Sequence, residues 1–190
     1  MRPIITLIAV PIMFAQSYET SLGTQTAEIM GGVVYRNVDG GVYNAVGTRI
    51  LGGLNRWVSL YGEYSYSRLL SETFYADPLQ GVCRCSVEER YRGSIMDFEG
   101  GGKLHLSGHR LQPYLLGGVG SVRISAKAVI GAFKETASDY RFASSVGGGV
   151  HIFATRNFGF SAEAKTVAVH DSSRFERYTV GLFYQHPARR

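Results

Sequence analysis

Long hydrophobic runs are almost absent from this chain of 190 residues, and that absence limits how it can meet a membrane. The one continuous apolar stretch lies at the N-terminus, within "MRPIITLIAVPIMFAQS". A helix needs roughly 20 apolar residues to span a bilayer, and this run is shorter. No later segment qualifies. The sequence therefore excludes transmembrane helices, and any membrane passage must be made by strands.

Helical repeats and basic runs are missing as well. No heptad and no longer repeat period is visible. The 20 Lys and Arg residues exceed the 15 Asp and Glu residues, but they are scattered, so the net charge of +5 does not predict a nucleic-acid partner. The glycine runs "GVG" and "GGG" lack the strand-loop-helix context and the lysine of a phosphate-binding loop, so nucleotide binding is not expected either.

Cysteine is scarce. The chain has two cysteines, Cys83 and Cys85, both in "GVCRCSVEER". Zinc sites need further cysteine or histidine ligands at suitable spacing, and none lies nearby. We expect a local disulfide or free thiols, with intermolecular pairing as the alternative. Neither a cofactor nor a metal is expected.

What the chain has in abundance is typical of β-structure: 24 Gly, 12 Tyr and 10 Phe residues. Segments with period-2 alternation of apolar and polar residues predict eight strands. They cover residues 26–36, 43–54, 57–67, 94–105, 112–124, 140–153, 157–168 and 175–185.

The N-terminal apolar run has the features of a signal peptide. Arg2 supplies the positive region, residues 4–14 the apolar region, and Ala15-Gln16-Ser17 the cleavage site. Pro3 and Pro11 argue against a buried strand, because proline cannot donate to a strand ladder. We predict a signal peptide over residues 1–17 and one domain over residues 18–190.

The connections between the predicted strands alternate in length. Short links follow the second, fourth and sixth strands, and longer ones follow the others. The longest predicted loops cover roughly residues 68–93 and residues 126–139. Short turns at one end and long loops at the other are typical of outer-membrane barrels. The sequence therefore predicts an all-β fold, an eight-stranded antiparallel up-and-down transmembrane β-barrel.

Strand parity predicts which side chains are enclosed. In residues 157–165 the alternation places Phe158, Phe160, Ala162 and Ala164 toward lipid. The predicted inner face also collects a balanced set of charges, which an enclosed space requires to be paired or hydrated. That set is Glu28, Arg49, Glu63, Asp97, Glu99, Lys103, Arg123, Glu163, Lys165 and Arg177. Leu51, Leu115 and Val119 are expected to point inward with them.

Aromatic residues on the predicted outer face gather near both ends of the strands. The group near the long loops is Tyr35, Tyr64, Tyr66, Phe142 and Tyr178. The group near the short turns is Tyr114, Phe158, Phe160 and Tyr184. Two aromatic girdles around an apolar band are the arrangement found at the two membrane interfaces.

Three segments resemble the small eight-stranded outer-membrane β-barrel family, which includes the OmpA transmembrane domain and the OmpX and Ail proteins. They are "PYLLGGVG" (113–120), "GGGVHIFATRNFGFSAEAK" (147–165) and "RYTVGLFYQ" (177–185). In the last, Thr179, Gly181 and Tyr184 resemble the C-terminal assembly signal of such barrels. The resemblance implies a location in the bacterial outer membrane.

Two sets of residues have chemical alternatives. His170, Ser172 and Glu176 resemble the base, nucleophile and orienting acid of the lipid A deacylase PagL, another eight-stranded barrel, so a lipid hydrolase is the alternative function. The other reading of these residues is a polar loop. His105 and His151 are expected inside the barrel near its short-turn end, either as hydrogen-bonding residues or as a paired metal site.

The function expected from these features is non-enzymatic, structural or adhesin-like. Expected partners are membrane lipid and lipopolysaccharide, together with an extracellular protein or surface ligand that contacts the outward loops, chiefly the 68–93 loop. Nucleic acid is not expected as a partner, and the barrel is expected to be a monomer.

Overall fold

The computed structural model describes residues 21–36, 41–68, 72–76, 87–106, 108–130, 133–170 and 174–186. The predicted signal peptide, Cys83, Cys85 and Ser172 lie outside these residues. Within this part of the chain, no helix is long and apolar enough to cross a membrane.

The described residues form nine strands, and the hydrogen-bonded order is β3-β2-β1-β9-β8-β7-β6-β5-β4 with an additional β3–β5 pairing. Their bounds are β1 Gln25–Arg36, β2 Val42–Gly53, β3 Val58–Arg68, β4 Glu72–Ala76, β5 Val87–His105, β6 Leu111–Ile130, β7 Phe133–Phe153, β8 Phe158–Val169 and β9 Arg174–His186. All pairings are antiparallel. The predicted all-β antiparallel architecture is confirmed.

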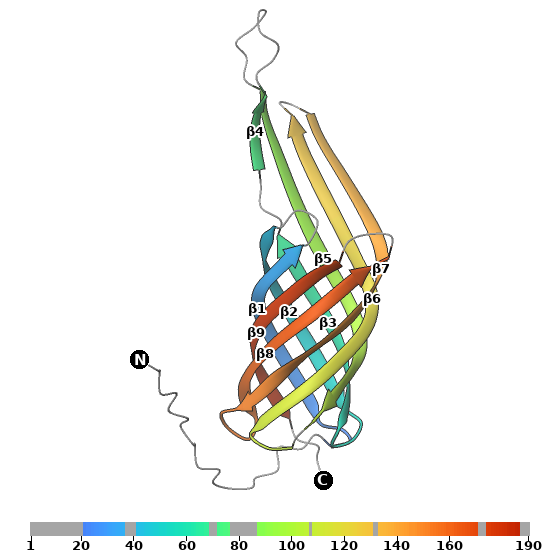
Figure 1. Cartoon of the computed structure of the whole chain (residues 1–190), viewed down its shortest axis with the longest axis vertical. Coiled ribbons are helices and arrows are strands. Elements are labelled where there is room, and N and C mark those ends of the chain that lie inside the picture. The colour runs from blue at the N-terminus through green and yellow to red at the C-terminus, as the bar shows by residue number, and fades with distance from the viewer. Residues whose placement is uncertain are drawn as a thin grey trace, which may run out of the picture.

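Two pairings close the sheet into a barrel of eight strands. β1 pairs with β9 from Gln25↔His186 to Arg36↔Phe175, and β3 pairs with β5. β4 pairs only with the upper part of β5 and so stands outside the ring (Figure 1). Closure satisfies the backbone hydrogen-bonding groups along the wall, which a bilayer requires.

Three strands continue beyond the barrel rim as an extended sheet. β6 and β7 pair up to Ile130↔Phe133, whereas β7 pairs with β8 only as far as Ala143↔Val169. Figure 1 shows β5, β6 and β7 rising together above the ring, with β4 beside β5. The predicted loop at 126–139 is therefore wrong, because this segment is mostly hairpin. Its side chains from residue 135 to 140 are exposed on both faces, so it carries no apolar alternation for sequence reading to detect.

Short turns at the opposite end of the barrel are capped by side chains. The side-chain Oδ1 of Asn55 accepts hydrogen bonds from the backbone N–H groups of Trp57 and Val58, at 2.8 and 2.9 Å. In the β7–β8 turn, Thr155 Oγ1 accepts from the N–H of Phe158 at 3.1 Å. Local polar side chains of this kind favour tight turns over continued strand. The predicted short links at this end are confirmed.

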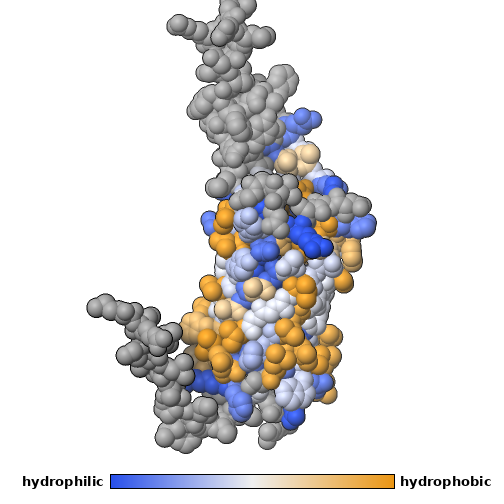
Figure 2. All heavy atoms as spheres, viewed as in Figure 1, coloured by the Kyte–Doolittle hydropathy of each residue, from blue (hydrophilic) through white to orange (hydrophobic). Residues whose placement is uncertain are grey.

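The outer wall is apolar, and the predicted alternation in residues 158–165 is confirmed residue by residue. Large hydrophobic side chains are exposed around the ring: Ile29, Val33, Val46, Ile50, Leu60, Phe98, Leu115, Val119, Val146, Phe160, Val180 and Leu182. Figure 2 shows such side chains over much of the barrel wall on the face in view. An exposed apolar surface of this extent is typical of a protein wall in contact with lipid, and it would be unfavourable in contact with water.

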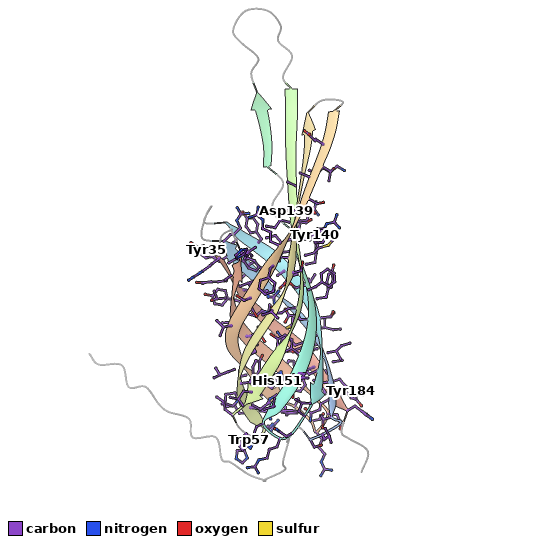
Figure 3. The ribbon with its side chains drawn as sticks, turned by 90° about the vertical axis from the view of Figure 1, so that its right-hand side faces the viewer. Tyr35, Trp57, Asp139, Tyr140, His151 and Tyr184 are labelled. Atoms are coloured by element: carbon purple, nitrogen blue, oxygen red, sulfur yellow. The ribbon has the colours of Figure 1, made fainter. Side chains whose placement is uncertain are left out.

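Aromatic rings stand at both ends of this wall, as predicted for most of them. Tyr35, Tyr64, Phe142 and Tyr178 are exposed toward the extended sheet, and Phe158, Phe160 and Tyr184 toward the short turns. In Figure 3, Tyr35 lies at the upper end of the ring, and Trp57 and Tyr184 lie at the lower end.

The parity predicted for β6 is wrong. Tyr114 is buried inside the barrel, and Leu115 and Val119 are 54% and 55% exposed on the outer wall. Arg123 is therefore also on the outer side, because it shares their parity. The segment "PYLLGGVG" has apolar residues on both faces, so alternation alone does not orient it. The structure places the phenol of Tyr114 where it has a polar partner and the aliphatic side chains against lipid.

Candidate functional site

The barrel interior is filled by three layers of side chains. The layer nearest the extended sheet is apolar and consists of Val34, Ala45, Ile95, Val122, Ala143, Val167, Val169 and Phe175. Below it lies a layer of charges, and near the short turns lie rings such as Phe153 and Phe183, whose centroids are 4.9 Å apart. An eight-stranded barrel is narrow enough for side chains to fill, and this one is filled.

Arg49 is the centre of the charged layer. Its guanidinium donates to Glu163 through Nη1 and Nη2 at 2.7 and 2.6 Å, and to Glu63 Oε2 through Nε and Nη2 at 2.9 and 2.5 Å. Nη1 also donates to Glu28 Oε2 at 3.0 Å. One arginine thus joins carboxylates from β1, β3 and β8. A fixed fork of donors makes arginine suited to this role.

Two further cations balance the remaining carboxylates. Lys165 Nζ lies 2.9 Å from Glu63 Oε1 and 3.1 Å from Glu99 Oε2. Arg177 contacts Glu63, and its Nη1 lies 3.2 Å from Asp97 Oδ2. Buried charges are tolerated only when paired and hydrogen-bonded, and this layer meets that condition by mutual pairing.

The sequence predicted this set well, with one error and one omission. Every charged residue predicted to face the interior is buried there except Arg123. The omission is Tyr61, which donates to Glu99; Tyr114, predicted to lie on the outer face, donates to Glu163 Oε2 at 2.9 Å. In each case the tyrosine pairs with a glycine on the neighbouring strand, and this combination of a large ring with a glycine is the sequence feature that could have indicated them. A Cβ at Gly149 would lie 2.6 Å from the Tyr114 hydroxyl oxygen.

The two interior histidines lie near each other but have different partners. The ring centroids of His105 and His151 are 6.3 Å apart. His105 Nε2 is 3.0 Å from Ser59 Oγ, and His151 Nε2 is 3.3 Å from Lys103 Nζ. The described residues hold no group of three or more His, Cys, Asp or Glu side chains suited to a metal ion. An ammonium group beside His151 also disfavours a bound cation electrostatically.

The alternative catalytic residues are only partly placed. Ser172 lies outside the described residues. His170 follows β8 and is exposed, and its backbone N–H donates to the carbonyl of Phe142 at 2.9 Å. Glu176 pairs with Thr166, which lies four residues before His170. At about 3.3 Å per residue, the backbones of Glu176 and His170 are therefore roughly 13 Å apart. The Glu176 carboxylate accepts a hydrogen bond from the Tyr178 hydroxyl at 2.6 Å.

The extended sheet offers a different kind of site, an open strand edge. Above Ala143, β7 pairs with β6 on one side, and none of the described strands pairs with it on the other. Beyond Phe142, whose carbonyl accepts from the His170 N–H, residues 133–141 therefore present backbone N–H and C=O groups along that side (Figure 1). Open edges are templates for pairing with another chain.

Comparison with known proteins finds likeness in structure. No family model matches the sequence, and no curated protein matches it. Ail of Yersinia pestis superposes with a TM-score of 0.59 at 14% identity, over 87% of this chain and 99% of Ail. The N-terminal β-barrel domain of Pseudomonas aeruginosa OprF gives 0.57 at 13% identity, over 88% and 100%. Neisserial surface protein A gives 0.55 at 12% identity, over 85% and 95%.

These neighbours share one fold with this chain, a small β-barrel. At such low identity the likeness concerns the fold, and it agrees with the closed ring and the two aromatic girdles described above. The chain is a closed eight-stranded antiparallel β-barrel with the fold of small outer-membrane barrels.

Proposed function

We propose that this barrel serves as a non-enzymatic surface-interaction protein that contacts an extracellular protein through the open β7 edge. The observation that carries the proposal is the nine-residue segment 133–141, which pairs with β6 on one side and with none of the described strands on the other. An extended segment of a partner can add to such an edge through backbone hydrogen bonds. In this proposal the barrel itself is an anchor and conducts nothing, and residues 1–17 are the signal peptide that directs its export.

The character of the sheet supports contact with water and partners. Residues 135–140 are exposed on both faces, and the ion pair between Arg141 Nε and Asp139 Oδ2, at 2.7 Å, is at the surface. Among the structural neighbours, Ail is named as an attachment invasion locus protein and has been solved with the heparin analogue sucrose octasulfate. The proposal assigns attachment to this chain, and places the contact on the sheet in preference to the 68–93 loop.

A trimmed hairpin tests the proposal without disturbing the barrel. Ser125 and Ser138 are direct partners in the β6–β7 ladder, so residues 126–137 can be replaced by Asn-Gly, which forms a two-residue hairpin turn. Cells that express the full chain should attach to surfaces coated with extracellular-matrix protein more than cells with the trimmed chain. Both barrels should keep heat-modifiable migration on gels. Equal attachment by the two would overturn the proposal.

A further inference from the structure

Two cations on the outer face of β6 have no acidic partner among the residues that the structure describes. Arg123 and Lys127 share the parity of the lipid-facing Leu115 and Val119, but lie nearer the extended sheet. The Arg123 guanidinium lies against a ring, with its Cζ 5.4 Å from the centroid of Tyr140. Its Nε is buried and has no hydrogen-bond partner. Within the described residues, neither cation pairs with a carboxylate.

The interior shows the opposite pattern. Arg49, Lys165 and Arg177 each contact two or more carboxylates there. On the extended sheet, Arg141 pairs with Asp139. The outward face around Arg123 therefore differs from the interior and from the extended sheet, because its cations have no carboxylate partners among the described residues. Anions from outside the chain are the natural complement.

The position of these residues along the barrel axis indicates which anions they contact. In Figure 3, Tyr140 lies at a height similar to that of Tyr35, at the upper end of the ring. Phe142, one step down the same face of β7, is exposed on the apolar wall. Cations directly above an apolar wall, beside aromatic rings, lie at the level of lipid headgroups.

We propose that Arg123 and Lys127, with Tyr140 supporting the guanidinium, bind the phosphate groups of a phosphorylated glycolipid in the outer leaflet. The proposal rests on the orientation given in the proposed function, with the extended sheet outside the cell. The two cations are four residues apart, roughly 13 Å along the strand, so they contact two separate phosphates of one headgroup. Val119 and Phe142 lie below them, where the acyl chains of the same lipid would pack.

The chain provides a matched control at its other end. Arg56 is exposed in the β2–β3 turn, and its Cζ lies 4.5 Å from the centroid of the Trp57 ring. It repeats the cation-on-ring arrangement of Arg123 at the opposite membrane surface. Arg56→Gln therefore removes a similar group from a place where the proposal assigns no phosphate.

The experiment measures the affinity of the purified full barrel for lipid A by titration and native mass spectrometry. At about 1 kcal/mol for each cation near a lipid surface, Arg123→Gln with Lys127→Gln should weaken binding roughly 30-fold, and Arg56→Gln should leave it unchanged. Wild type should bind enzymatically dephosphorylated lipid A as weakly as the double variant binds lipid A. Inorganic pyrophosphate, the soluble probe, should not compete at lipid-saturating concentrations.

Three results would overturn the assignment: full binding by the double variant, equal loss in Arg56→Gln, or competition by pyrophosphate at the lipid's own affinity. Heat-modifiable migration checks that each variant folds. If the double variant does not fold, Lys127→Gln alone, on the exposed sheet, should weaken binding roughly fivefold. Because no protein partner is present, failure here is separate from failure of the attachment assay.

Discussion

Arg49 on β2 and Glu163 on β8 form a two-point ion pair across the barrel interior, with N–O distances of 2.7 and 2.6 Å. Their strands are not neighbours, because β1 and β9 lie between them in the ring. The pair therefore joins separate parts of the wall through side chains, in addition to the backbone ladder. Both side chains are almost completely removed from solvent, so each charge requires a counter-ion within the interior.

Replacing Arg49 with methionine should destabilise the barrel strongly. The change leaves Glu28, Glu63 and Glu163 facing one another without their shared cation, and breaking a buried pair costs about 3–5 kcal/mol. Unfolding by urea from lipid vesicles measures the loss. Arg174→Gln, at an exposed position, should change stability by less than about 0.5 kcal/mol. A similar small effect for both variants would show that the charged layer contributes little.

Gly118→Ala and Gly62→Ala should differ sharply although the chemical change is the same. A Cβ at Gly118 would lie 2.5 Å from Glu99 Oε1 and 2.6 Å from the Tyr61 hydroxyl, whereas nothing lies within 4 Å of a Cβ at Gly62. Overpacking costs about 1–3 kcal/mol. Gly118→Ala should lose that amount in the same urea assay, and Gly62→Ala should stay close to wild type. Equal stabilities of the two variants would show that the Tyr61 hydroxyl does not lie beside Gly118.

Arginine on the outer wall should be costly in proportion to depth. Ala162 and Ala168 lie on the same outward face of β8, the first beside the middle of the apolar wall and the second near its upper end. Arginine costs about 2–4 kcal/mol at the bilayer midplane and about 0–1 near the interface. Folding yields in vesicles should therefore fall for Ala162→Arg and change little for Ala168→Arg. The reverse order would contradict the assigned membrane position.

The barrel should not conduct ions. Its interior holds an apolar layer over a charged layer in which cations and carboxylates contact one another, so no continuous water path is expected. The ionic current across a planar bilayer that contains the purified barrel should stay at the level measured without protein. A porin in the same apparatus should produce stepwise increases in current. Reproducible current steps that depend on the protein would show that the side-chain layers of the interior open to form a water path.

Ser172→Ala should leave lipid A acylation unchanged. Glu176 lies opposite Thr166 and accepts a hydrogen bond from Tyr178, and a hydrolytic triad requires an acid that orients the histidine. Mass spectra of lipid A from cells overexpressing wild type, Ser172→Ala and His170→Ala should be the same as those of cells with empty vector. A deacylated species that appears with wild type and vanishes in both variants would favour the hydrolase alternative.

The sequence predicted the ring because lipid and interior impose opposite polarity on alternate residues, as in Phe160 and Ser161. It failed for β6, where glycines and aliphatic residues on both faces remove that contrast and Tyr114 is oriented by a partner on β8. It also failed above the membrane at 126–139. At residues 135–140 the side chains on both faces of the sheet are exposed, and the ladder depends on backbone hydrogen bonds that leave no polarity pattern. The open β7 edge could not be predicted for the same reason.

The β1–β9 seam joins the first and last strands of the barrel, from Gln25↔His186 to Arg36↔Phe175. The wall therefore cannot be completed until β9 is available to pair with β1, and every earlier intermediate has two unpaired edges. Non-local closure of this kind slows spontaneous folding and exposes intermediates to aggregation. The seam therefore makes closure of the ring a late step in folding, which depends on two strands that lie about 150 residues apart in the chain.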